Sequence, residues 1–129
     1  MSQLNFWAVA VAAIAGFVAA FAYYAVFGER LAAAGSAVTD ERPPAWIPVF
    51  ELAKHLVVAA VVAGLVVAMD VTTWLGALLV GLVMWLGFPA VLLAGSVVHE
   101  NVPWKVALIH AGDWFAKLVI IAVIVSVWR

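Results

Sequence analysis

The chain contains no cysteine, few charged residues and almost no net charge. Without cysteine it has no disulfide, no thiolate nucleophile and no thiolate metal ligand. Its formal net charge of −1 argues against nucleic-acid binding, which requires a basic stripe. Charged residues make up only 10% of the sequence, whereas a soluble domain has about a quarter. These absences leave too few charged side chains to cover the surface of a soluble protein.

Apolar residues dominate the composition. They account for 69% of the 129 residues, and the mean hydropathy is +1.22. A soluble domain of this length would leave much of that apolar surface in water. We therefore expect an integral membrane protein with a single transmembrane domain over residues 1–129. A cleaved signal peptide is not expected, because residues 1–5 contain no Lys or Arg and the apolar run Phe6–Phe27 is too long.

Long apolar runs predict the secondary structure. A membrane-spanning helix needs about 20 mostly apolar residues, and the sequence contains such runs at about 5–27, 46–69, 73–95 and 104–128. The runs do not alternate as strands would, so the expected fold is all-α, an antiparallel up-down four-helix bundle. We expect Gly28–Ala45 to form a polar connection. Pro89 lies inside the third run and should bend that helix near Gly87.

Aromatic and basic residues predict the orientation. Tryptophans and tyrosines gather near the expected helix ends, as in interfacial aromatic belts. One set comprises Trp7, Trp74 and Trp128, and the other comprises Trp46 and Trp104 with Tyr23 and Tyr24. The basic residues Arg30, Arg42 and Lys105 accompany the second set, against Arg129 alone at the other face. Because basic loops stay in the cytoplasm, we expect a multi-pass protein of the bacterial plasma membrane with both termini outside.

Ionisable residues inside the apolar runs are the candidate functional residues. His110, Asp113 and Lys117 have the spacing i, i+3, i+7, which places them on one face of the last helix. A second set shares one face of the helix at 46–69 and comprises Glu51, Lys54 and His55. An unpaired charge near mid-bilayer costs roughly 3 kcal/mol on insertion scales. We therefore expect both sets to face inward, with Asp113 paired to Lys117.

Two interpretations of this polar cluster remain open. In the first interpretation, a neutralised ion pair only fixes two helices against each other. Alternatively, the histidines and carboxylates relay protons or ions. A metal site of His110, Asp113 and Glu51 lacks a further ligand, and His99-Glu100 is followed by Pro103 where a metalloprotease needs histidine. We predict no metal, no cofactor and no enzymatic activity, since the sequence has no recognisable catalytic motif.

Small residues spaced four apart predict close helix packing. Such rows let helix backbones approach in lipid, where no hydrophobic force drives helices together. The rows are centred on Gly16 with Ala12 and Ala20, on Gly64 with Ala60 and Ala68, and on Gly81 with Ala77. We expect these three glycines to lie at helix–helix contacts.

Several short stretches carry a family resemblance. They are Trp85-Leu86-Gly87-Phe88, His99-Glu100-Asn101-Val102-Pro103-Trp104-Lys105 and Ile109-His110-Ala111-Gly112-Asp113-Trp114, with Asn5, Tyr24, Phe27-Gly28 and Trp128. Together they resemble the domain-of-unknown-function 1761 family. The resemblance covers the whole chain and implies a small bacterial four-helix membrane protein. Many members of that family have Asn-Ala-Gly-Tyr where this chain has His110-Ala111-Gly112-Asp113, which makes these charges a feature of a subgroup. The resemblance implies no biochemical activity.

The sequence thus leads to two hypotheses about function. The first is a polar-cored homo-oligomer in the lipid bilayer that conducts or senses protons or a small solute. The second is a non-catalytic accessory or assembly subunit of a larger membrane complex. An enzyme acting on lipid near Glu100 and Lys105 would lack a nucleophile.

Overall fold

A computed structural model describes residues 4–35 and 44–128, and the regular structure in these two ranges is helical. The elements are α1 (Phe6–Ala33), α2 (Trp46–Ala68), α3 (Trp74–Gly87), α4 (Pro89–His99) and α5 (Trp104–Val127). α3 and α4 together form one apolar rod, Trp74–His99, and the described chain has four rods long and apolar enough to cross a membrane. The predicted all-α fold with four spans is confirmed, and the protein is a multi-pass membrane protein.

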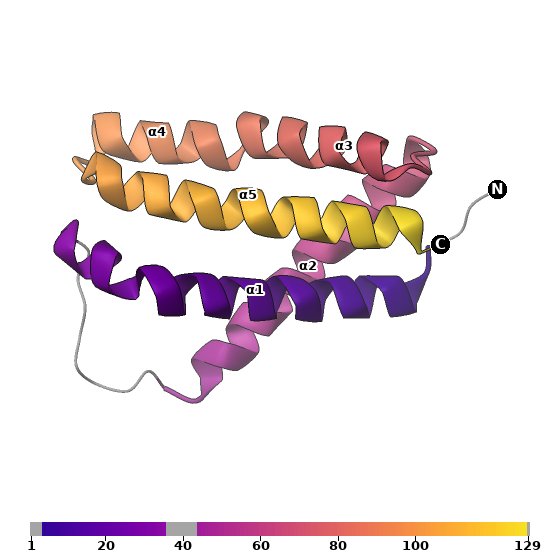
Figure 1. Cartoon of the computed structure of the whole chain (residues 1–129), viewed down its shortest axis with the longest axis horizontal. Coiled ribbons are helices and arrows are strands. Elements are labelled where there is room, and N and C mark those ends of the chain that lie inside the picture. The colour runs from indigo at the N-terminus through magenta and orange to yellow at the C-terminus, as the bar shows by residue number, and fades with distance from the viewer. Residues whose placement is uncertain (1–3, 36–43, 129) are drawn as a thin grey trace.

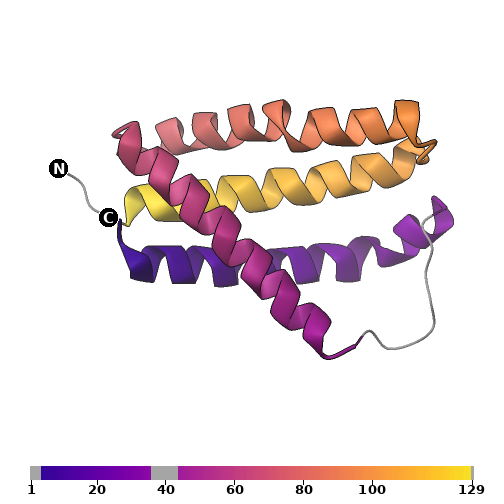
Figure 2. The same ribbon diagram turned by 180° about the vertical axis from the view of Figure 1, so that it is seen from behind.

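The helices pack around α5. In Figure 1, α5 lies between α1 on one side and the α3–α4 rod on the other, while α2 crosses them obliquely from behind. Figure 2 shows from the other side that α2 meets the rest of the bundle where it joins α3 and diverges from it toward its own start. We call the end that contains the α2–α3 turn the Thr72 end and the end where α5 begins the Lys105 end. α1 starts and α5 finishes at the Thr72 end (Figure 1).

The first helix is longer than predicted. α1 continues past Phe27 to Ala33, so the beginning of the stretch expected to be a connection is helical. The residues from Glu29 to Ala33 are mostly good helix formers, and the helix stops before Gly35, whose φ is +107°. The rest of the expected connection at 36–43, including Arg42, lies outside the described residues, as does Arg129.

The third membrane-spanning segment, α3 with α4, is interrupted next to Pro89, as the sequence predicts. α3 ends at Gly87 and α4 begins at Pro89, with Phe88 at φ −123° and ψ −79° between them. Proline has no N–H for the preceding turn and its ring crowds the carbonyl four residues earlier. The expected bend near Gly87 is therefore a break in the helix at Phe88.

The apolar core lies toward the Thr72 end, where α1, α2, α3 and α5 converge. It is built from small and branched side chains, and its largest fully buried members are Ile121, Val62 and Val66. Gly16 and Gly81 are buried there: a Cβ on Gly16 would stand 3.1 Å from Ile121 Cδ1, and one on Gly81 would stand 3.4 Å from the Leu118 carbonyl oxygen. Both glycines thus lie at contacts with α5.

Gly64 makes no helix–helix contact inside the chain, so its predicted contact stays a prediction. No atom lies within 4 Å of the position its Cβ would take, and its neighbours in the row, Ala60 and Ala68, are exposed. The inward face of α2 instead comprises His55, Ala59, Val62, Ala63 and Val66. Because both faces of this helix are apolar, the small-residue row alone did not reveal which face points inward.

Candidate functional site

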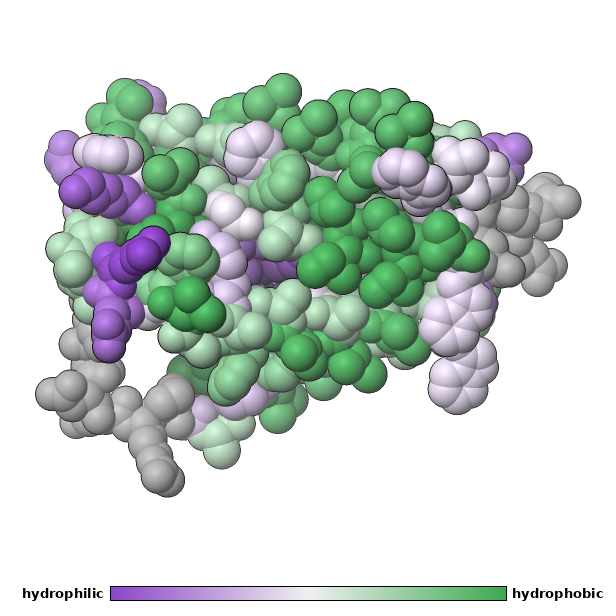
Figure 3. Space-filling model, viewed as in Figure 1, coloured by the Kyte–Doolittle hydropathy of each residue, from purple (hydrophilic) through white to green (hydrophobic). Residues whose placement is uncertain are grey.

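A cleft of about 640 Å³ opens between α1, α2 and α5. Its lining residues come from all three helices, and Figure 2 shows that α2 diverges from the other two toward its own start. Figure 3 shows recessed hydrophilic side chains about half-way along the molecule, surrounded by hydrophobic ones. The ionisable residues that line it are Glu51, Lys54, His55, His110, Asp113 and Lys117, the two predicted sets, joined by Tyr24. The structure therefore brings both sets to one cleft, which we call the polar cleft.

A buried ion pair lies at the bottom of the polar cleft. The Lys117 ammonium is 2.9 Å from Asp113 Oδ2, and the two side chains are only 6% and 4% exposed. The pair spans one helical turn with the acid first, as expected for i, i+4 partners. The ammonium also lies 4.0 Å from the centre of the Trp114 ring, a distance at which a cation is attracted to the face of an aromatic ring. Asp113 and Lys117 thus neutralise each other within α5.

Tyr24 joins the α5 residues from the neighbouring helix. Its hydroxyl is 2.6 Å from His110 Nδ1 and donates a longer hydrogen bond, 3.4 Å, to Asp113 Oδ2. One assignment of protons satisfies every contact: His110 Nδ1–H donates to the tyrosine oxygen, and the tyrosine hydroxyl and the Lys117 ammonium both donate to Asp113. His110, Tyr24, Asp113 and Lys117 therefore form one connected network of exchangeable protons, which we call the α1–α5 network.

The α2 residues form a separate pair at the mouth of the cleft. The Lys54 ammonium lies 3.1 Å from Glu51 Oε1, and the two side chains are 42% and 38% exposed. Among the described residues, each lysine that lines the cleft is thus paired with a carboxylate of its own helix. The two sets share the cleft, but no hydrogen bond or ion pair in the described chain joins them directly.

His55 is the most deeply buried member of the α2 set. Its side chain faces α1, where its ring meets that of Phe17 edge-on and its Cδ2 would stand 3.1 Å from a Cβ on Gly16. Its Nδ1 lies 2.7 Å from the Glu51 carbonyl oxygen. A carbonyl only accepts, so Nδ1 is the donor and Nε2 of the neutral ring is an acceptor. Nε2 is buried and has no hydrogen-bond partner in the described chain.

The comparison with known protein families agrees with the sequence motifs. A family model described as "Protein of unknown function (DUF1761)" matches residues 7–126. The chain belongs to the DUF1761 family. No curated protein and no solved structure matches it. In this DUF1761 protein, the stretch Ile109–Trp114 that carried the resemblance is the part of α5 that lines the polar cleft with His110 and Asp113.

Sequence reasoning missed several residues of this DUF1761 site. Tyr23 and Tyr24 were assigned to the aromatic belt, yet Tyr23 donates a hydrogen bond of 2.5 Å to the Ile109 carbonyl and Tyr24 belongs to the α1–α5 network. The sequence signal for their role was the presence of two adjacent tyrosine hydroxyls in the otherwise apolar run Phe6–Phe27. Glycine at position 112 permits the close contact between Tyr23 and α5, because a Cβ there would collide with the Tyr23 hydroxyl.

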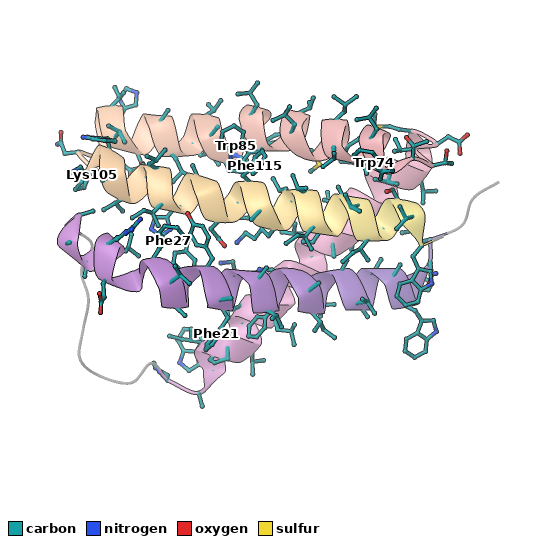
Figure 4. The ribbon with its side chains drawn as sticks, in the orientation of Figure 1. Phe21, Phe27, Trp74, Trp85, Lys105 and Phe115 are labelled. Carbon is teal, nitrogen blue, oxygen red and sulfur yellow. The ribbon has the colours of Figure 1, made fainter. Side chains whose placement is uncertain are left out.

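The two tryptophans inside the expected spans have polar partners. The Lys117 ammonium lies over the face of the Trp114 ring. Trp85 donates an indole hydrogen bond of 2.8 Å to the Ala111 carbonyl and packs edge-on against Phe115 (Figure 4). These contacts explain why neither ring lies with the interfacial tryptophans.

The carboxylates of the polar cleft are already engaged by lysines. Asp113 binds Lys117 and Glu51 binds Lys54. Within the described residues no three His, Asp or Glu side chains converge in a way that would hold a metal ion. What the arrangement offers chemically is a set of hydrogen-bond donors and acceptors in a cleft whose remaining lining is mostly apolar.

Proposed function

We propose that this DUF1761 protein senses protons or a small polar solute in the polar cleft. The observation that supports this proposal is the gathering of six ionisable side chains from α2 and α5 around one cleft in the middle of an apolar bundle. Ionisable groups inside a membrane are expensive and usually serve a pathway or a binding site. A cleft of several hundred Å³ is also the size of small-molecule sites.

The position of the polar groups favours sensing over conduction. Toward the Thr72 end, beyond the level of Lys117, two buried polar side chains lie in the described chain. His55 contacts Gly16 beside Ile121, and the Ser126 hydroxyl bonds to the Val123 carbonyl of its own helix; the other buried side chains there are apolar. A conduction path would need polar groups or water through this part of the bundle. The polar cleft therefore serves one side of the membrane, as a receptor site does.

Protonation of His110 is the event that the proposal invokes. Histidine is the side chain that ordinarily changes charge between about pH 5 and 8. A second proton on His110 binds Nε2, so that both ring nitrogens are donors. It makes the existing Nδ1–H bond to Tyr24 charge-assisted and adds a positive charge two turns from Lys117. The Trp114 ring lies against that ammonium, so its fluorescence is expected to report the change.

The test is a pH titration of Trp114 emission in proteoliposomes, obtained as the difference between the native chain and Trp114→Phe. We expect a transition between pH 5 and 8 that His110→Gln abolishes and that His99→Gln, at the exposed end of α4, leaves unchanged. An emission that is constant across this range would overturn the sensing proposal. A proton flux above that of empty liposomes, lost in Asp113→Asn, would replace sensing by conduction.

We further propose that the protein is a homo-oligomer. The row formed by Ala60, Gly64 and Ala68 lies outside the monomer's contacts, and rows of small residues allow close approach of helices in lipid. Native mass spectrometry of gently solubilised membranes tests this assembly. A complex of identical chains is expected, and a stoichiometric foreign partner would favour an accessory subunit of a larger complex.

The proposed orientation places the Lys105 end in the cytoplasm of a bacterial plasma membrane. Arg30 and Lys105 both lie at this end, and basic residues near membrane-spanning helices are retained on the cytoplasmic side. In this orientation the chain termini face outward.

A further inference from the structure

A second pocket, separate from the polar cleft, lies at the Lys105 end. It measures about 430 Å³ and is formed by the last turn of α1 and the first turns of α5. Its lining comprises Arg30, Ala33 and Ala34 with Trp104, Lys105, Leu108 and Ile109, and none of these residues lines the polar cleft. We propose that this pocket binds the phosphate headgroup of an anionic phospholipid.

The charge of the pocket fits an anion. Its two ionisable residues, Arg30 and Lys105, are both basic and come from different helices. In the described chain the salt bridges join other residues, and the two cations rest on aromatic rings instead. The Arg30 guanidinium lies 5.5 Å from the centre of the Phe27 ring, and the Lys105 ammonium lies 5.7 Å from that of Trp104. Both charges are therefore available to a ligand.

The surroundings of the two cations fit a lipid better than a free ion. Trp104 is 62% exposed, and an exposed tryptophan at a helix end is typical of the headgroup level of a membrane. The rest of the lining is apolar, and Leu108, one turn further along α5, is 62% exposed. A free phosphate makes no use of this apolar surface, whereas an acyl chain covers it.

The surface view agrees with a position of the second pocket at the membrane boundary. In Figure 3 hydrophilic side chains gather at the end where α1 finishes and α5 begins, beside hydrophobic side chains that continue along the bundle. Figure 4 places Lys105 at the start of α5, with Phe27 on the neighbouring stretch of α1. Basic pockets between membrane helices at such a boundary bind anionic headgroups.

The experiment measures lipid binding to the purified full chain by native mass spectrometry. The probes are dioleoylphosphatidylglycerol, which is anionic, and dioleoylphosphatidylcholine, which is zwitterionic with the same acyl chains. We expect the native chain to prefer the anionic lipid. Arg30→Gln and Lys105→Gln should each weaken that preference about fivefold, and the double variant should abolish most of it. Lys54→Gln removes a cation outside the pocket and is expected to retain the preference.

Three outcomes would overturn the proposal. Equal binding of both lipids by the native chain would show that the pocket does not recognise charge. Undiminished preference in the double variant would place the site elsewhere. Displacement of the anionic lipid by millimolar inorganic phosphate would assign the pocket to a free phosphate group. Circular dichroism of each variant checks that it is folded, which is expected because Arg30 and Lys105 are exposed.

Discussion

The Tyr24 hydroxyl of α1 and the His110 Nδ1 of α5 lie 2.6 Å apart although 86 positions separate them in the chain. This contact makes the polar residues of α5 part of a two-helix network, because the same hydroxyl also reaches Asp113. A change of protonation at His110 is therefore expected to act on the contact between α1 and α5 and not on α5 alone.

The buried ion pair predicts an order among substitutions. Asp113→Asn leaves the Lys117 ammonium buried without its carboxylate, and breaking such a pair typically costs about 3–5 kcal/mol. The double variant Asp113→Asn, Lys117→Met removes both charges and should be distinctly more stable than Asp113→Asn alone. Thermal unfolding of the purified chain in detergent measures both. Equal stability of the single and double variants would mean that the pair is not coupled.

The contact between Gly112 and Tyr23 predicts a second pattern. Gly112→Ala puts a methyl group onto the Tyr23 hydroxyl, and such overpacking typically costs about 1–3 kcal/mol. Tyr23→Phe removes the oxygen and leaves a ring carbon at 3.3 Å, so Gly112→Ala should be better tolerated in that background. The matched control is Gly95→Ala, where nothing lies within 4 Å of the new Cβ and alanine favours the helix. Similar losses at both glycines would contradict the assigned contact.

The outward position of Gly64 predicts that its substitution separates folding from assembly. Gly64→Leu meets no atom within 4 Å at its Cβ and replaces glycine by a better helix former. We expect the monomer to keep its thermal stability, and the proposed homo-oligomer to dissociate because a leucine keeps the backbones apart. Size-exclusion chromatography with light scattering reports the assembly. A destabilised monomer would mean that Gly64 packs inside the chain after all.

The proposed orientation is tested by cysteine labelling, for which the absence of native cysteine gives a clean background. Thr72→Cys lies in the exposed α2–α3 turn and Glu100→Cys in the exposed connection between α4 and α5. In intact cells a membrane-impermeant maleimide should label Thr72→Cys only, and Glu100→Cys should react after the cells are opened. The reverse pattern would invert the topology.

The sequence determined the features that depend on local spacing and on composition. Four long apolar runs required four membrane spans, because lipid accepts only a backbone that satisfies its own hydrogen bonds. The break at Phe88 followed from Pro89, since proline lacks the needed N–H. The pairing of Asp113 with Lys117 followed from their spacing of four, which one helix fixes without help from its neighbours.

Only the tertiary structure decided which helix faces meet and where the bundle opens. The sequence reasoning expected helix contacts of α2 both at His55 and at the row around Gly64. The structure turns Ala59 and Val62 inward with His55 and leaves Gly64 without a contact inside the chain. It placed Tyr24 in an interfacial belt, whereas the oblique crossing of α2 leaves a cleft in which Tyr24 meets His110. A helix in lipid is apolar on its inner and outer sides alike, so hydrophobic periodicity does not distinguish them. Close packing between whole helices sets their rotation and crossing angles, and that information is distributed over residues far apart in the chain.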